Sequence, residues 1–188
     1  MKLLIALGNP GPKYKETRHN AGFLMLDLLV EREGGEWLKE QFSSTVGRMR
    51  LFGEDCWLLK PMTFMNLSGR AVAEAARFWK IPPCDWVVLH DDIDVPALKV
   101  KARSGGSAGG HNGVTSIMVE TGEDQFHRLK LGVGKPPPEV RMDVAAWVLD
   151  RMSTVELEAL SKEMYDETKE RLRNIFKQQE AEGRAAKK

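Results

Sequence analysis

The sequence predicts a single α/β domain with a mixed β-sheet packed between helices. Short, uninterrupted apolar runs, typical of strands buried on both faces, alternate with longer runs at helical spacing. One later run alternates apolar and basic residues, as in a strand with one exposed face, so we expect mixed pairing. The chain has 188 residues without a repeat or linker. We assign residues 1–178 to one domain with a sizeable core and expect a charged, frayed tail at 179–188.

The first half of the chain contains apolar runs that fit three buried strands and two helices. Glycine and proline mark most of their ends: Gly34-Gly35 follows the first helix, Pro61 the second buried strand and Pro82-Pro83 the second helix. The predicted order is a strand at 3–7, a helix at 21–33, a connection with an edge strand within 37–53, a strand at 56–60, a helix at 70–80 and a strand at 86–89.

The second half begins with the alternating run and ends in helix. A glycine-rich loop at 105–113 opens one helix, and a triple proline after Gly134 follows the last strand. Ser153 and Glu156 form a capping box, which predicts where the final helix starts. The predicted order is a strand at 98–103, a helix at 114–120, a strand at 128–133, a short helix at 144–149 and one long helix from the capping box to Gln178.

Composition limits the classes of function. The formal net charge is +1, so any affinity for nucleic acid must come from a local patch. The two cysteines, Cys56 and Cys84, lack metal-like spacing, and a reducing cytoplasm fits them best. No apolar run reaches about 18 residues and the chain enters a strand at once, so we expect neither a membrane span nor a leader.

Three asparagines stand beside or close to glycine in loops that follow strand-like runs: Asn9, Asn66 and Asn112. Such loops are where parallel sheets bind ligands. The amide of asparagine offers one acceptor and two donors without charge. Asparagine near glycine also makes ordinary turns, but three of them, with histidine and aspartate nearby, predict a pocket for a peptide-like group or a water molecule.

We predict that His19 and Asp91 act as a general base and its orienting carboxylate. An imidazole with an ordinary pKa of about 6.5 can take a proton from water near neutral pH. A carboxylate on its other nitrogen fixes the tautomer and stabilises the imidazolium as it forms. His90 lies on the other side of the strand alternation, and we interpret it as structural; His127 is more ambiguous and receives the same interpretation.

Three other motifs suggest different chemistry. The Gly-Asn-Pro-Gly turn at 8–11 hints at a dinucleotide site, but the G-x-G-x-x-G spacing is absent and no helix begins there. Residues 105–109 match a G-x-S-x-G nucleophile elbow around Ser107, although the strand before them carries lysine and arginine. The acidic run at 91–94, with the histidines, could bind a divalent metal, but its spacing is not diagnostic.

Basic residues predict a local site for phosphate. Lys101 and Arg103 share one face of their strand, and we expect Lys130 on a neighbouring strand. Together with the amino end of the helix at 114–120 they can bind an anion, or they can form a solvated strand face. Tyr14 can stack on a base.

Six motifs stand in order along the chain: GNPG at 8–11, TRHNAG at 17–22, TFMNLSG at 63–69, HDDID at 90–94, GGHNG at 109–113 and FHRLKLG at 126–132. As an ordered set they resemble the bacterial-type peptidyl-tRNA hydrolase family. The resemblance implies a single domain with a mixed, twisted sheet between helices. It also implies a monomeric cytoplasmic esterase that cleaves peptidyl-tRNA, from stalled or aborted translation, into free peptide and tRNA.

The resemblance also implies roles for individual residues, with no metal and no other cofactor. His19 matches the catalytic base and Asp91 its orienting carboxylate. The remaining matches are amides that hold peptide main chain and the attacking water (Asn9, Asn66, Asn112), pocket residues (Met65, His111), an aromatic beside the tRNA end (Tyr14) and basic residues that grip tRNA phosphates (Lys101, Arg103, Lys130).

Two segments depart from the family pattern. Residues 104–108 differ from many members, which further weakens the nucleophile interpretation of Ser107, and Asp92-Ile93 replaces a common Glu-Leu pair. Relatives that serve RNA splicing leave non-catalytic RNA binding as the alternative function. Retention of His19, Asp91 and the three amides favours hydrolysis by direct attack of water.

Overall fold

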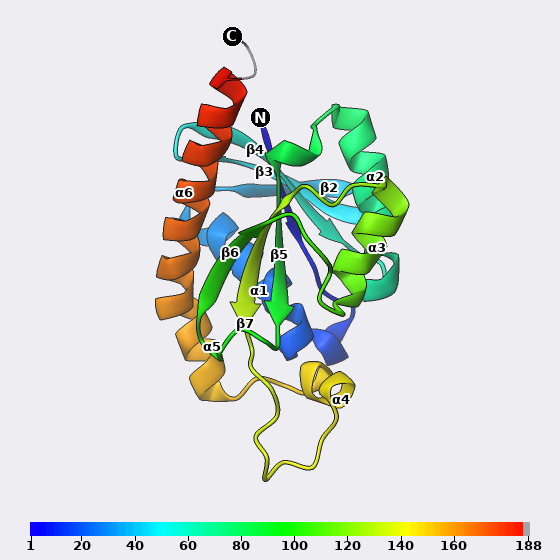
Figure 1. Ribbon diagram of the computed structural model, residues 1–188, viewed down its shortest axis with the longest axis vertical. Coiled ribbons are helices and arrows are strands. Elements are labelled where there is room, and N and C mark those ends of the chain that lie inside the picture. The colour runs from blue at the N-terminus through cyan, green and yellow to red at the C-terminus, as the bar shows by residue number, and fades with distance from the viewer. Residues whose placement is uncertain (186–188) are drawn as a thin grey trace.

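The computed structural model describes residues 1–185 of the chain, with side chains described as far as Glu182. Its seven strands are β1 (Lys2–Ala6), β2 (Glu36–Gln41), β3 (Ser44–Leu51), β4 (Glu54–Pro61), β5 (Trp86–Asp92), β6 (Val100–Ser104) and β7 (His127–Gly132). They form one sheet in the order β2-β3-β4-β1-β5-β7-β6 (Figure 1). The single α/β domain with a mixed sheet confirms the predicted fold class.

The four central strands are parallel and the outer strands are antiparallel. β1 pairs with β4 and β5, so that Leu4 aligns with Leu58 on one side and Val87 on the other. β7 continues the parallel set, whereas β3 and β2 at one edge and β6 at the other run antiparallel to their neighbours. The loops after β1, β4 and β5 therefore meet at one end of the sheet, which we call the carboxyl edge.

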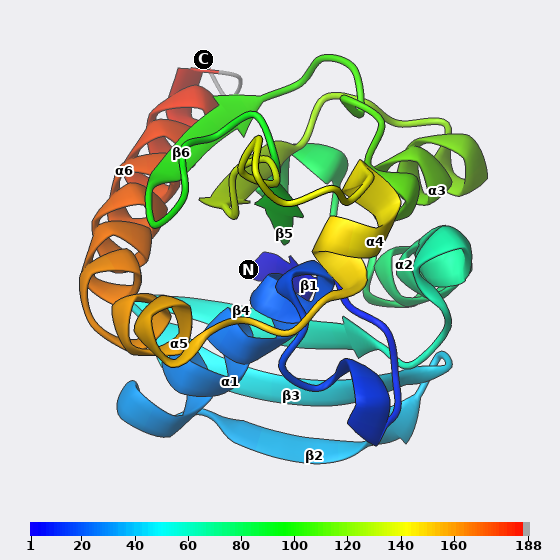
Figure 2. The same ribbon diagram turned by 90° about the horizontal axis from the view of Figure 1, so that it is seen from below.

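Helices cover both faces of the sheet (Figure 2). The first face carries α1 (Ala21–Arg32), α5 (Thr154–Ser161) and α6 (Glu163–Ala185), and the second carries α2 (Ser68–Trp79) and α3 (Asn112–Thr121). Alternate residues of β1 join two separate cores: Leu4 and Ala6 pack with the first group, and Leu3 and Ile5 with the second. This division explains the uninterrupted apolar run in β1.

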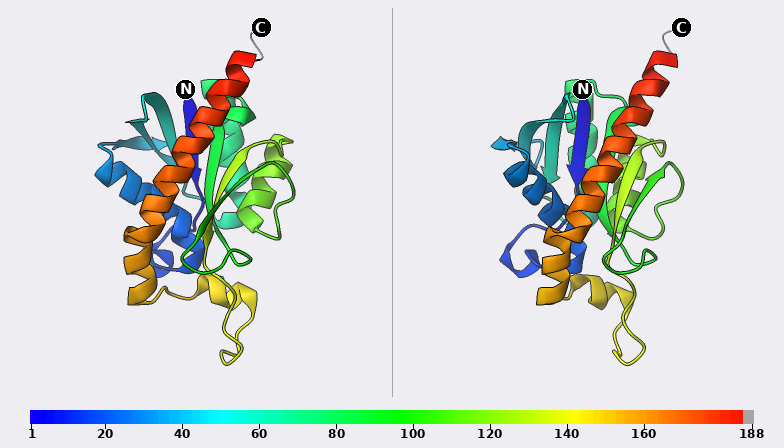
Figure 3. Two further views of the ribbon diagram at one scale, coloured as in Figure 1. Left: turned by 60° about the vertical axis from the view of Figure 1, so that its left-hand side comes forward. Right: turned by 90° about the vertical axis from the view of Figure 1, so that its left-hand side faces the viewer.

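Short elements lie around the carboxyl edge. Helix α4 (Val144–Leu149) lies across that edge, below β1 and β5 (Figures 1 and 3). The 3₁₀ turns are η1 (Pro12–Tyr14), η2 (Arg18–Asn20), η3 (Met65–Leu67) and, at the other end of the sheet, η4 (Pro83–Asp85). Turns η1 to η3 follow β1 and β4, so the chain carries their side chains to the same edge as Asp91.

Two predicted elements differ from the structure. The segment predicted to hold one edge strand is a hairpin of β2 and β3, whose turn places Phe42 and Ser43 at φ 55° and 49°. Phenylalanine and serine do not predict a left-handed turn, whereas asparagine and glycine would. The predicted long helix is two helices that break at Lys162 (φ −119°, ψ −92°). Leu160 before the break and Met164 after it are both buried in the core.

The last helix continues beyond Gln178, where the sequence predicts that a tail begins. Gln179 is buried, and its amide donates to the Cys84 carbonyl oxygen at 2.8 Å. This contact holds α6 against the loop before β5; residues 186–188 of the predicted tail lie outside the described part. Within residues 1–185, no helix combines the length and apolarity that a membrane crossing requires.

Candidate active site

A cavity of about 610 Å³ opens at the carboxyl edge of the sheet. Its polar wall includes six of the predicted site residues, and its apolar wall comes from α4 and the loops after β4 and β5. The lining residues are Asn9, His19, Phe64, Met65, Asn66, Asp91, Asp92, Ile93, Gly109, Gly110, His111, Asn112, Val144, Ala145, Val148 and Leu149. Five segments that are distant in sequence therefore build one pocket.

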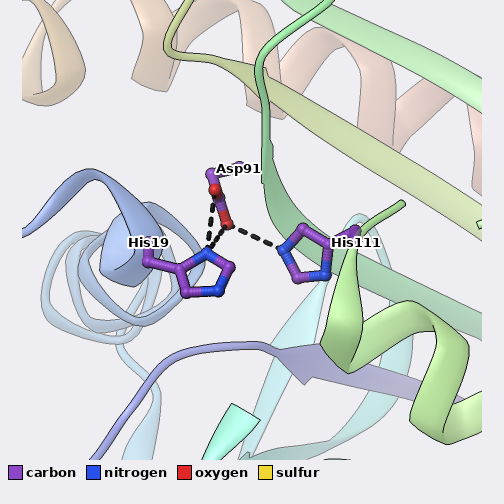
Figure 4. Close-up of side chains that lie close together, drawn as sticks. All are labelled: His19, Asp91 and His111. Carbon is purple, nitrogen blue, oxygen red and sulfur yellow. Dashed lines mark hydrogen bonds and ion pairs between the residues drawn. The ribbon is translucent and has the colours of Figure 1, made fainter. Parts of the chain in front are cut away.

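Asp91, one of the residues that line this cavity, lies between two imidazoles (Figure 4). His19 Nδ1 is 2.9 Å from both carboxylate oxygens of Asp91, and His111 Nε2 is 2.8 Å from Oδ1. Burial by itself would raise the pKa of Asp91, but the charges and hydrogen bonds of His111 and His19 hold it well below its usual range. Asp91 is therefore a fixed negative charge that orients both rings.

The two imidazoles differ in what their second nitrogen does. His111 caps α3, and its Nδ1 accepts from the backbone amides of Gly113 and Val114 at 3.2 and 3.3 Å. An acceptor Nδ1 requires the proton on Nε2, so both nitrogens of His111 are engaged. Nε2 of His19 has no hydrogen bond among the described residues, and its ring lines the cavity. Only His19 can present a free lone pair to a bound molecule.

Close packing of α1 on the sheet brings His19 to Asp91. A side chain on Gly22 would meet the Leu89 carbonyl oxygen at 2.4 Å and the Leu7 carbonyl oxygen at 2.7 Å. Glycine thus lets the first turn of α1 approach the ends of β1 and β5. Turn η2 directly precedes this contact, and it places His19 beside Asp91 of β5.

The amide of Asn9 is oriented by two neighbours. Asn20 Oδ1 accepts from the Asn9 backbone amide at 2.8 Å, and Asn20 Nδ2 donates to the Asn9 carbonyl at 2.9 Å. The side-chain Oδ1 of Asn9 accepts from the Met65 backbone amide at 2.8 Å. With its oxygen engaged, Asn9 directs its NH₂ group to the cavity that it lines. No role was predicted for Asn20, although the place of this polar residue directly after His19 is a signal that could have indicated one.

The other predicted pocket residues are brought together, with one exception. Met65 is a buried wall of the cavity, whereas Asn66 and Asn112 are exposed at it. Asn112 does not directly follow the carboxyl end of a parallel strand, as was expected. Strand β6 is antiparallel and ends at the opposite end of the sheet, and the loop at 105–111 brings the chain back to the carboxyl edge. Tyr14 lies at the end of η1, outside the cavity lining, with the Lys13 ammonium 4.7 Å from its ring centre.

Met65 was a predicted pocket residue, but the contribution of α4 to the apolar wall was not predicted from the sequence. Val144, Val148 and Leu149 of α4 line the cavity, as does Phe64, which is 57% exposed. The short helix was predicted, but nothing in its six residues indicates which surface they cover. Its placement depends on contacts with η2, such as that between Arg18 and Trp147, which are 129 positions apart.

The basic residues lie along the β6 edge. Lys101 is paired in register with Lys130, and Arg103 with Arg128. Lys101 and Arg103 are exposed, whereas the ammonium of Lys130 is 2.7 Å from Asp92. Arg128 is buried and donates to the carbonyls of the glycine-rich loop, at 2.8 Å for Gly106, 2.7 Å for Ser107 and also to Gly105. Arg128 therefore anchors this loop.

The geometry bears on two alternative chemistries, a serine nucleophile at Ser107 and a metal site. Ser107 is outside the cavity lining, so the nucleophile-elbow motif does not place a serine at the polar wall. His19, Asp91 and His111 each offer a ligand atom, all within 4.8 Å of one another, and could hold a metal ion. Nε2 of His19 is free for a metal, but both nitrogens of His111 are engaged, so a metal would have to replace a hydrogen bond of His111.

Comparison with known proteins identifies the family. The family model described as Peptidyl-tRNA hydrolase matches residues 3–188. A peptidyl-tRNA hydrolase of Geobacter sulfurreducens is 49% identical over 160 residues, which are 85% of this chain and 81% of that protein. One from Lactobacillus delbrueckii is 45% identical over 149 residues, 79% of each protein.

A solved structure gives the same result. The crystal structure of peptidyl-tRNA hydrolase from Acinetobacter baumannii has a TM-score of 0.85 and 32% sequence identity. The match covers 97% of this chain and 91% of that one. These relatives are named as hydrolases, and none of them supports the alternative of a non-catalytic RNA-binding protein. The chain belongs to the peptidyl-tRNA hydrolase family.

Proposed function

We propose that this protein hydrolyses the ester bond between a peptide and tRNA, with His19 as the general base. Nε2 of His19 takes a proton from water while the water oxygen attacks the ester carbonyl. The resulting tetrahedral oxyanion collapses, the bond to the ribose oxygen breaks, and His19 returns the proton to that oxygen. The products are a free peptide acid and a tRNA with a free hydroxyl. The proposed reaction forms no covalent intermediate between the enzyme and the peptide.

One observation carries the assignment of the base: the contact of His19 Nδ1 with Asp91 at 2.9 Å on the cavity wall. It assigns the Nδ1 proton to the Asp91 side of the ring and leaves Nε2 as the acceptor. The buried negative charge of Asp91 stabilises the imidazolium that forms during attack. His111 has both nitrogens engaged, so it supports Asp91 instead of competing for the proton.

The amides supply hydrogen bonds to the substrate. The NH₂ group of Asn9 is the donor that faces the cavity, and it suits the developing oxyanion or the attacking water. Asn66 and Asn112 at the rim suit the main chain of the peptide. Uncharged amides also favour a peptide bond over the charged α-amine of an aminoacyl-tRNA. Aminoacyl-tRNA, which translation needs, would therefore be spared from hydrolysis.

The tRNA is assigned to the β6 side of the cavity. Lys101 and Arg103 are exposed there, and Lys130 extends the basic surface toward Asp92. Tyr14, outside the cavity, remains the predicted contact for the tRNA end. A monomeric state and a cytoplasmic location complete the proposal; light scattering of the purified protein, alone and with tRNA, tests the first of these.

Replacement of the base tests the mechanism. His19→Ala should lower turnover of peptidyl-tRNA by about 10²–10⁴-fold, because a general base contributes that much. Binding of tRNA should stay close to that of the wild type. His127→Ala is the matched control, since His127 is also buried but begins β7 at the far end of the sheet. Equal turnover by the wild type and His19→Ala would refute the assignment.

Two further arms separate the other chemistries. Turnover should be unchanged by a chelator and by Ser107→Ala, because the proposed step uses neither a metal nor a serine. Loss of activity with the chelator, restored by a divalent cation, would assign the cluster of His19, Asp91 and His111 to a metal. Tight tRNA binding by a wild-type protein without turnover would favour the RNA-binding alternative.

A further inference from the structure

Arg18, the residue before the proposed base, is only 5% exposed, and its partners lie near the other end of the chain. Its Nε and Nη2 donate to the two carboxylate oxygens of Glu156 at 2.8 and 3.0 Å. Glu156 also completes the capping box of α5 with Ser153. Burial would raise the pKa of Glu156, but the bonds from Arg18 and Ser153 hold it below its usual range. Glu156 is therefore a fixed anion that holds the guanidinium fork.

The flat face of the same guanidinium packs on α4. The Arg18 guanidinium carbon is 3.5 Å from the centre of the Trp147 ring, and Nη1 donates to the Trp147 carbonyl at 3.3 Å. The indole Nε1 of Trp147 in turn donates to the Gly134 carbonyl at 2.9 Å. One arginine thus links the turn that carries His19, the helix of the apolar wall and the chain just after β7.

Backbone pairing places these segments side by side. The Arg18 amide donates to the Asp150 carbonyl at 3.2 Å, and the Met152 amide donates to the Glu16 carbonyl at 2.9 Å. Thr17 and Arg151 form an antiparallel bridge between them. The backbone bridge fixes the chain after α4, while the Arg18 side chain contacts α4 itself.

We infer that Arg18 is a positioning residue, which fixes the position of the α4 wall relative to His19 in the cavity that both line. Val144, Val148 and Leu149 line the cavity from α4, so their distance from His19 depends on the Arg18–Trp147 contact. This inference rests on the proposed function of His19. A lysine at position 18 could reach Glu156, but it could not also stack its charge as a plane on Trp147.

The test compares Arg18→Lys and Trp147→Leu, separately and together, with the wild type. Each single change should lower kcat/KM for peptidyl-tRNA about 10- to 100-fold, as a shift of about 1 Å at a site can. The double change should lower kcat/KM no more than the larger single change does, because both single changes remove the same contact between Arg18 and Trp147. The affinity for tRNA alone should stay within twofold, and hydrogen exchange should accelerate at the α4 amides while α6 is unchanged.

The matched control is Arg32→Lys. Arg32 also packs on an aromatic ring, with its guanidinium carbon 4.5 Å from the Tyr165 ring centre, and donates to the Ser161 carbonyl at 2.6 Å. It lies at the end of α1, away from the cavity, so its replacement should leave kcat/KM within twofold. Thermal unfolding of every variant gives the folded fraction, to which each kcat/KM is corrected.

The outcomes separate this inference from the proposed function. If Arg18→Lys and Trp147→Leu keep the wild-type kcat/KM per folded molecule while His19→Ala is inactive, Arg18 is a structural residue and the inference is wrong. Additive losses in the double variant would also overturn it, since the two side chains would then act independently. If His19→Ala itself retains turnover, the proposed function fails first.

Discussion

At the scale of single residues, the histidines around Asp91 differ in which nitrogen is engaged. His19 bonds through Nδ1 alone, and His111 through both nitrogens. His90 is fully buried behind them, and its Nδ1 is 2.7 Å from the Asp91 carbonyl oxygen. Burial, with the nearby charge of His111, lowers the pKa of His90 to about 3. His90 therefore stays neutral, and an uncharged ring can pack against His111.

The buried neutral ring predicts how stability depends on pH. The unfolded chain binds a proton at His90 near its ordinary pKa of about 6.5, whereas the folded chain binds it only near 3. Stability should therefore fall as pH drops below 6.5, by at most about 1.4 kcal/mol per pH unit from this group. Urea unfolding from pH 7.5 to 4.5 should show a shallower decline for His90→Asn than for the wild type. Parallel curves would contradict this account of His90.

At the scale of elements, the site depends on how closely α1 approaches β1 and β5. Turn η2 has three residues, and each forms hydrogen bonds outside the turn. Arg18 bonds to Glu156, His19 to Asp91 and Asn20 to the backbone of Asn9. Such a turn cannot shift without moving the base, the amide and the α4 wall together. Gly22 permits the close approach that makes these contacts possible.

Gly22→Ala should therefore disturb both stability and catalysis. The new methyl group would have to displace backbone carbonyls, and overpacking of this kind costs about 1–3 kcal/mol of unfolding free energy. Because α1 and η2 would move together, kcat/KM should also fall about 10- to 100-fold. The control is Glu31→Ala, an exposed position on the same helix, which should change neither quantity appreciably. Wild-type kinetics in Gly22→Ala would show that His19 is held independently of the α1 contact.

At the scale of the whole molecule, the basic residues that we propose for tRNA binding lie on one edge of the sheet. Lys101 and Arg103 are exposed on β6, at one side, while β2 forms the opposite edge. Lys130 is paired in register with Lys101, but its charge is shared with Asp92. The net charge of +1 gives no general attraction to nucleic acid, so the position of this edge decides where a tRNA can bind.

Salt dependence tests that surface. Lys101→Ala and Arg103→Ala should each weaken tRNA binding and reduce the slope of log K against log salt by about 0.7–0.9, the value for one phosphate contact. The corrected rate of the chemical step should change much less. Lys39→Ala is the control, because Lys39 is exposed on β2 at the opposite edge. Unchanged affinity at every salt concentration in the β6 variants would remove this edge from the proposal.

Much of the architecture followed from local patterns in the sequence. Apolar runs located the parallel strands, and glycine, proline and a capping box located most helix ends. Patterns failed where no residue signalled the event: the left-handed turn at Phe42 and Ser43, and the helix break at Lys162. In both places the neighbouring side chains pack against distant elements, Phe42 on Trp79 and both Leu160 and Met164 in the core. A window of sequence contains only one side of such packing.

Fold class, family resemblance and most of the polar residues that meet in the cavity could be predicted from the chain alone, because residue type and motif order are local properties. Tertiary structure decided which nitrogens remain free, where α4 lies and what Arg18 contacts. His19 and Asp91 are 72 positions apart, and Arg18 and Glu156 are 138 apart. Hydrogen-bond partners at such separations exist only after the sheet has formed, so they determine which of several candidate residues can act as the base.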